Sequence, residues 1–298
     1  SKVPFYTILD WIGNNRYLEI INNAWNCETT WFKHEVADFT MDGICWPELD
    51  HSAMHYFWLE FFLSLELVKK FKENSISKLL IANSDELNAV VHYHQGSICK
   101  LIWKHEFSDI IEYVDSYPKN NKIYRKDFIF QSKFHELLFS DVSIIKDKIC
   151  FYASGVEISR SKDLIIDLIT TYPKEVVIIP NNLHNDDILT ILTYILNTWK
   201  IPVVSLPNIL ANEKCDSLQF LKAYQKMKNH SHVNILEKYL SILDFHFTFY
   251  CENRWPKLVQ LFRYYDNLFR KNPPKFILGS TVNMTEWHIP ILAAQNNG

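Results

Sequence analysis

The chain has 298 residues, of which 48% are hydrophobic and 22% charged, and its formal net charge is -3. These values are typical of a globular protein, exclude a disordered chain, and allow two domains. No basic stretch is sustained and no apolar run approaches about 18 residues, so we expect no nucleic-acid partner and no transmembrane segment.

Cysteine and glycine usage narrows the class of protein further. The six cysteines lack CxxC spacing, and Cys99 and Cys150 fall in apparent strands, which favours reduced thiols and a cytoplasmic location. The N-terminal residues do not resemble a signal peptide. Only six glycines are present, and neither GxGxxG nor GxxxxGK[ST] occurs, so no Gly-rich phosphate loop is expected. We predict neither a metal nor another cofactor.

An acid-rich stretch, residues 34–51, comes first among the candidate sites. Its carboxylates could accept hydrogen bonds from sugar hydroxyls, although a solvated loop explains the same composition. We take Asp42 as a candidate base and four neighbours as acceptor-binding candidates. These four are Asp38, Glu48, Asp50 and His51.

A long helix and the first strand–helix–strand unit follow. Residues 51–74 predict one helix, because apolar side chains recur at helical spacing from Met54 to Val68. Residues 77–103 predict a strand, a helix and a second strand that ends near His105 and Glu106. Ligands of a parallel sheet bind beyond the carboxyl ends of its strands. Asp85, His105 and Glu106 are therefore catalytic candidates, with helix capping and a surface pair as the alternatives.

The second half of the chain repeats this pattern. The polar residues 115–127 indicate a linker, and we place a domain boundary near residue 146. Apolar strands are predicted at 150–153, 176–179, 202–205 and 276–279, with helices over 159–173, 218–227 and 255–271. The fold class is thus α/β, with two Rossmann-like lobes, 1–145 and 146–298, each containing a parallel sheet that is buried on both faces.

Polar residues directly after two of these strands are candidate phosphate ligands. A Ser-Gly turn at a helix N-terminus could accept a phosphate, and an ordinary turn explains it equally well. The candidates are Ser154, Gly155, Glu157, Asn181 and Asn182.

Residues 38–86 are similar to the N-terminal lobe of bacterial surface-polysaccharide glycosyltransferases of the GT-B type. The match consists of a GI-x-W-x-x-L segment at 43–49, a long helix, and a strand that ends in a polar turn. In that family a later strand finishes in Gln-His-Gly, and His105 matches the His without the flanking Gln and Gly. Residues 148–155 resemble the opening strand of the second lobe. Residues 289–298 resemble a strand that finishes in Gln-His-Gly, with Asn in place of His.

The resemblance implies transfer of a sugar from a nucleotide-sugar donor to a glycan acceptor in surface polysaccharide synthesis, without a required metal. It implies acceptor binding in 1–145 and donor binding in 146–298. Ser154 and Gly155 would then hold the donor diphosphate, while His105 or the 38–50 acids deprotonate the acceptor. The Gly-rich and Glu-rich donor motifs of many members are missing. The implied compartment is the cytoplasm, with peripheral association with the inner membrane left open.

Two other classes of protein fit parts of the sequence. Residues 174–208 are similar to the middle of sugar-binding proteins of the periplasmic type I fold and of related repressors. The stretch between the first plausible strand and Val176 is, however, longer than such proteins need. A non-catalytic α/β interaction domain is the third interpretation, and the low glycine content favours it.

Overall fold

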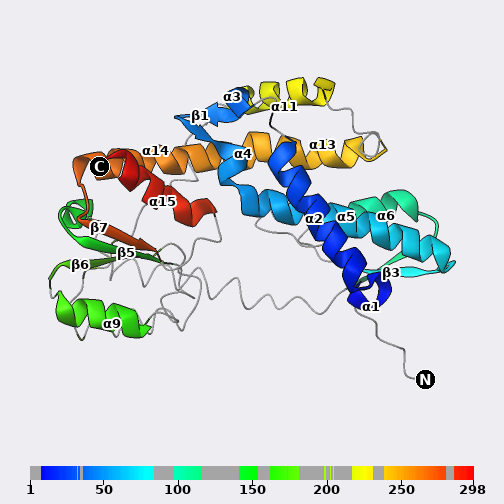
Figure 1. Cartoon of the computed structure of the whole chain (residues 1–298), viewed down its shortest axis with the longest axis horizontal. Coiled ribbons are helices and arrows are strands. Elements are labelled where there is room, and N and C mark those ends of the chain that lie inside the picture. The colour runs from blue at the N-terminus through cyan, green and yellow to red at the C-terminus, as the bar shows by residue number, and fades with distance from the viewer. Residues whose placement is uncertain are drawn as a thin grey trace. The chain divides into compact units, whose positions relative to one another are not determined.

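The computed structural model describes residues 8–31, 33, 36–83, 97–115, 141–153, 162–172, 174–180, 198, 202, 204, 217–230, 238–279 and 285–298. This part of the chain is mostly helical with small parallel and antiparallel sheets, so its class is mixed α/β. Two compact units divide the chain (Figure 1). The first unit contains Ser1–Lys119 and Ser217–Trp255, and the second contains Asn120–Asp216 and Pro256–Gly298. Both units are discontinuous in sequence, unlike the predicted lobes 1–145 and 146–298.

Helices form most of the first unit. The long predicted helix is present as α5 (His51–Glu73), and α2 (Asn14–Thr30) packs along it. The remaining helices are α1 (Ile8–Ile12), α3 (Val36–Phe39), α4 (Trp46–Leu49), α6 (Ser97–Glu106), α11 (Leu218–His230), α13 (Leu240–Phe249) and the π-helical turn η4 (Tyr250–Arg254). None of the described helices combines the length and apolar character needed to cross a membrane.

An aromatic core joins the two segments of the first unit. Trp31 lies at the end of α2, and its ring centroid is 4.7 Å from Phe247 of α13 and 6.1 Å from Trp255. Phe57 of α5 meets Phe247 edge to face at 5.1 Å. The aromatic stripe that the sequence shows along α5 is therefore buried in the core rather than presented to a ligand.

Two small sheets complete the first unit. β3 (Leu79–Asn83) pairs in parallel with β4 (Ile111–Asp115), as a strand–helix–strand unit requires. The second strand of this unit was predicted near residues 102–106, and that prediction is wrong, because α6 occupies this stretch. Ile98 and Ile102, one helical turn apart, are both buried. β1 (Thr40–Met41) and β2 (Ile44–Cys45) form an antiparallel hairpin.

A three-stranded parallel sheet is the centre of the second unit. Its order is β6-β5-β7, with β5 at Ile149–Ala153, β6 at Val176–Pro180 and β7 at Phe276–Gly279. Val204 adds a bridge beside β6, since its N–H donates to the carbonyl of Ile178. Of the predicted strand 202–205, the structure describes residues 202 and 204, and residue 204 forms a β-bridge. Figure 1 draws α9 (Lys162–Thr171) on one side of this sheet and α14 (Trp255–Lys271) and α15 (Thr285–Asn296) on the other.

Burial along this sheet follows the prediction in two of its strands. The residues of β5 from Ile149 to Tyr152 and of β6 from Val176 to Ile179 are buried. In β7, Phe276 is 59% exposed and Leu278 is also exposed, and in β3 of the first unit Leu80 is 56% exposed, so the prediction of burial on both faces is wrong for these two strands. β7 pairs only with β5 among the described residues, and an edge position explains its exposure.

Candidate functional site

The acid-rich stretch 38–51 folds into α3, the hairpin, α4 and the start of α5. Asp42 and Gly43 form the two-residue hairpin turn, with φ angles of 55° and 78°. Positive φ at both positions is the type I′ geometry that Asp-Gly sequences favour. The exposed Asp42 side chain therefore stands on a turn whose backbone already requires this dipeptide.

Two other acids of this stretch are also at the surface. Asp38 accepts an ion-pair contact from Lys226 of α11 at 2.6 Å. Gln219 of α11 donates to the carbonyls of Asp38 and Thr40, so α11 holds this segment in place. Glu48 is exposed in the first turn of α4, where an acid suits the helix dipole. These observations favour local structural roles for Asp38 and Glu48.

Asp50, by contrast, is fully buried. Nε of Arg254 donates to its Oδ2 at 2.6 Å, and Nη2 of the same guanidinium donates to its Oδ1 at 2.7 Å. The two residues are 204 positions apart and join the N-terminal segment of the first unit to η4. Because one guanidinium occupies both carboxylate oxygens, Asp50 serves the stability of the unit rather than the binding of an acceptor.

His105 and Glu106 are in the last turn of α6, where a strand end was predicted. The Glu106 carboxylate pairs with Lys72 and Lys238 and accepts a hydrogen bond from the Tyr239 hydroxyl at 2.8 Å. Burial opposes ionisation, but the bonds from Lys238, Lys72 and Tyr239 prevail and lower the pKa of Glu106 to about 2. So weak a base is unsuited to removing a proton from a hydroxyl. The strand-end position that motivated both candidates is absent.

The remaining predicted residues lie outside the described part of the chain. β5 and β6 end at the paired residues Ala153 and Pro180, so the chain leaves the sheet at the same edge after both strands. The residues that follow and that stay predictions are Ser154, Gly155, Glu157, Asn181 and Asn182. Asp85, which follows β3, also lies outside the described residues.

A second acid–imidazole pair, which was not predicted from the sequence, forms between α2 and α5. Glu28 of α2 and His55 of α5 are hydrogen-bonded, with 3.1 Å between Oε2 and Nδ1. The Glu28 side chain is 3% exposed and that of His55 is 16% exposed. The carboxylate is thus in the protein interior, while the imidazole in front of it reaches the surface. We name these two residues the Glu28–His55 dyad.

The protein environment shifts the pKa of both members of the dyad. Burial raises the pKa of Glu28 to about 7. Desolvation, and after it the charge of His51, lowers the pKa of His55. Glu28 therefore gains and loses its proton near neutral pH, next to an imidazole that is a weaker base than usual. The predicted residue His51 therefore does lie near this site, one helical turn before His55.

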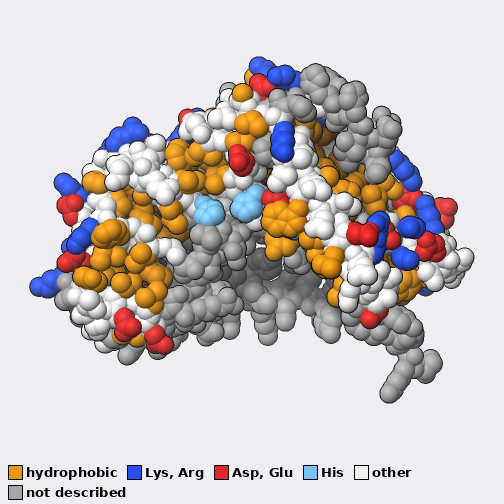
Figure 2. All heavy atoms as spheres, viewed as in Figure 1, with side chains coloured by type: hydrophobic (Ala, Val, Ile, Leu, Met, Phe, Trp, Pro, Cys, Tyr) orange, Lys and Arg blue, Asp and Glu red, His pale blue; other side chains and the backbone are white. Residues whose placement is uncertain are grey.

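Aromatic rings border the dyad. The ring of Trp25 on α2 lies over the imidazole of His55, with 4.4 Å between centroids and an interplanar angle of 36°. Tyr56 on α5 is 6.1 Å from the same imidazole. Figure 2 shows histidine side chains reaching the surface next to hydrophobic ones on the face drawn.

Local sequence contained a weak signal for this site. Trp25 and Glu28 are spaced i, i+3, and His51 and His55 are spaced i, i+4, so each pair lies on one face of its helix. The signal was missed because neither pair shows which face meets the other helix.

No group of three or more His, Cys, Asp or Glu side chains is placed to hold a metal ion within the residues that the structure describes. Comparison with protein-family models, with curated proteins and with solved structures gives no match to this chain.

Proposed function

We propose that this protein is a glycosyltransferase, which moves a sugar from a nucleotide-sugar donor to a hydroxyl group of a glycan acceptor in surface polysaccharide synthesis. The proposal includes the finer architecture of two Rossmann-like lobes of the GT-B type and action in the cytoplasm. The observation that carries it is the Glu28–His55 dyad, a buried carboxyl group hydrogen-bonded to a partly exposed imidazole.

The dyad supplies the base that sugar transfer needs. A sugar hydroxyl is a poor nucleophile near neutral pH, and a positioned base contributes about a hundredfold to ten-thousandfold. Because Nδ1 of His55 is engaged by Glu28, Nε2 is the nitrogen that can accept the hydroxyl proton. When Glu28 is ionised, its carboxylate accepts a hydrogen bond from Nδ1–H of His55 and holds the ring with Nε2 available for the proton. The sugar–diphosphate bond breaks as the new glycosidic bond forms, and the nucleoside diphosphate leaves.

The parallel strands of the second unit support a donor site. β5 and β6 end at the same sheet edge, and ligands of such sheets bind beyond this edge. Under this proposal, the five donor candidates that follow these strands hold the nucleotide sugar. The diphosphate would be bound by backbone N–H groups of residues 154–157.

Calorimetry with nucleotide sugars, followed by assays of nucleoside diphosphate release, tests the proposal. We expect His55→Ala and Glu28→Gln to lower kcat by about a hundredfold or more while donor affinity stays within about twofold. Phe245→Ala is the matched control, because Phe245 is an exposed ring on α13 of the same unit. It should leave both quantities unchanged.

Two outcomes would overturn the assignment. One is the failure of every nucleotide and nucleotide sugar to bind the folded full-length chain. The other is turnover by both dyad variants at the wild-type rate. Binding of free sugars without any donor-dependent transfer would instead favour the sugar-binding class of protein.

A further inference from the structure

The surface beside the Glu28–His55 dyad is unusually aromatic. Trp25 is 47% exposed and Tyr56 is 49% exposed, although both rings lie near the mostly buried imidazole of His55. We name Trp25, His55 and Tyr56 the aromatic shelf. An exposed indole does not contribute the favourable free energy of burial. A ligand that covers the Trp25 ring would gain this free energy on binding.

The shelf and the dyad offer two complementary kinds of contact. The rings offer an apolar surface, while the imidazole and carboxylate beside them exchange hydrogen bonds. A pyranose ring matches this combination, because C–H groups cover its faces and hydroxyl groups surround its edge. A purely apolar ligand would leave the dyad without a partner, and a purely polar one would leave the rings in water.

The charges of the side chains at the dyad indicate which class of saccharide fits. Glu28 is hydrogen-bonded to His55, and no lysine or arginine pairs with this carboxyl group among the described residues. Glu106 of the same unit pairs with two lysines, Lys72 and Lys238, whereas the partner of Glu28 in the described part of the chain is an imidazole, which carries no fixed charge. A carboxylate or phosphate on the ligand would therefore meet an acid rather than a fixed positive charge.

We propose that the aromatic shelf binds the ring of an uncharged pyranose unit of the acceptor, stacked on Trp25, with a hydroxyl group directed to His55. The inference rests on the proposed function in taking this sugar to be the acceptor. It goes further in naming a neutral saccharide and the residues that bind its ring.

Binding in the absence of any donor tests the shelf. The probes are neutral hexose di- to tetrasaccharides, matched oligosaccharides that contain uronate or sialic acid, and nucleoside monophosphates. Binding to the full-length chain is followed by saturation-transfer NMR and by tryptophan fluorescence. We expect a neutral saccharide to bind, with at least tenfold weaker binding of its acidic counterpart.

Variants locate the binding surface. Trp25→Ala should weaken binding of the neutral saccharide at least tenfold, Tyr56→Ala severalfold, and Trp25→Phe should keep it within about threefold of wild type. Phe245→Ala should bind as wild type does. Circular dichroism confirms that each variant is folded, and because Trp25 and Tyr56 are about half exposed, their truncation should leave the core intact.

The shelf is overturned if Trp25→Ala binds as wild type does, if acidic saccharides or nucleotides bind as well as neutral ones, or if no saccharide binds. Failure of the proposed function looks different. Trp25-dependent saccharide binding without transfer from any nucleotide sugar would retain the shelf and remove the transferase. Donor-dependent transfer that is unaffected by Trp25→Ala would do the reverse.

Discussion

Two carboxylates of the first unit, Asp50 and Glu28, are both buried and both paired with a nitrogenous side chain. Asp50 faces a guanidinium that is always charged and that occupies both of its oxygens. Glu28 faces an imidazole through one oxygen, at 3.1 Å. The first arrangement fixes the charges and joins two segments. The second leaves a proton that moves near neutral pH.

Glu106 extends the comparison. It is as buried as Glu28, but two lysines and a tyrosine hydroxyl surround it, and its pKa falls to about 2 while that of Glu28 rises to about 7. Burial alone therefore does not decide what a carboxylate does. The number and the charge of its hydrogen-bond donors decide whether it stabilises the fold or exchanges protons.

The largest expected effect comes from breaking the Asp50–Arg254 pair. Asp50→Ala leaves a guanidinium buried without its carboxylate, which costs about 3–5 kcal/mol of unfolding free energy. Urea denaturation measures this cost. Asp38→Ala is the control, because Asp38 and Lys226 are half exposed and such pairs contribute about 0–1 kcal/mol. A loss below about 1 kcal/mol for Asp50→Ala would show that this pair does not join the two segments.

Glu106→Gln should cost about 2 kcal/mol, because it leaves Lys72 and Lys238 next to each other without a carboxylate between them. The pH dependence has a definite sign. Since the folded pKa is lowered to about 2, this contribution is complete above about pH 4.5 and is lost as the pH falls toward 2. Equal stability differences between wild type and variant at pH 7 and pH 3 would contradict the assigned network.

Glu28→Gln should act in the opposite direction. Because burial raises the folded pKa to about 7, the wild type is most stable below about pH 4.5 and loses stability as the pH rises through 7. The neutral variant avoids this loss and should be more stable than wild type by about 1–2 kcal/mol at pH 8. A gain in stability together with a loss of turnover would be the mark of a functional residue. A variant that is less stable at pH 8 would place Glu28 in the same class as Asp50.

Much of the secondary structure could be predicted from the sequence, because it depends on local patterns. The strands at 79–82, 150–153, 176–179 and 276–279 and the helices at 51–74, 159–173, 218–227 and 255–271 are confirmed within a few residues. Continuous apolar runs and helical spacing need no information from distant parts of the chain.

Errors arose where distant residues decide the structure. Residues 102–106 are helical partly because Glu60 of α5 accepts the N–H groups of Ile98 and Cys99 at the start of α6. This cap comes from 38 positions away and leaves no local signal. Glu28 and His55 are 27 positions apart, and Asp50 and Arg254 are 204 apart. No spacing rule connects such residues, so both pairs were out of reach of a single sequence.

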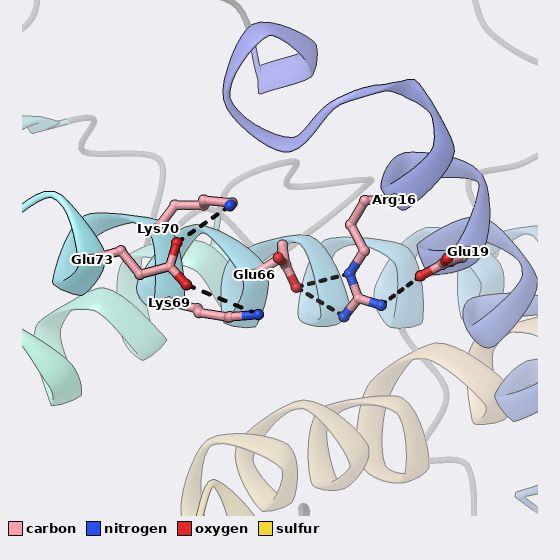
Figure 3. A network of polar contacts seen from close by, with 6 residues as sticks. All are labelled: Arg16, Glu19, Glu66, Lys69, Lys70 and Glu73. Atoms are coloured by element: carbon pink, nitrogen blue, oxygen red, sulfur yellow. Dashed lines mark hydrogen bonds and ion pairs between the residues drawn. The ribbon is translucent and has the colours of Figure 1, made fainter.

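The smallest expected effect concerns a charge network that also joins α2 to α5 and is centred on the half-exposed Arg16. Figure 3 shows Arg16 of α2 between Glu19 of its own helix and Glu66 of α5. Nε and Nη2 of Arg16 donate to one oxygen of Glu66 at 3.0 and 2.9 Å, and Nη1 donates to Glu19 at 2.6 Å. Arg16 is about half exposed, so water and salt screen these contacts.

A double-mutant cycle with Arg16→Met and Glu66→Gln should give a coupling of about 0.5–1 kcal/mol at low ionic strength, and about half of that in 0.5 M NaCl. The corresponding cycle with Glu19→Gln should give about 0.3 kcal/mol, because Glu19 is the more exposed acid. A different result would be an Arg16–Glu66 coupling above about 2 kcal/mol that does not change with salt concentration. Solvent exposure would then not explain why the Arg16 contacts and the Asp50–Arg254 pair differ in strength. The distinction would then have to rest on geometry, since Arg16 uses one oxygen of Glu66 where Arg254 uses both oxygens of Asp50.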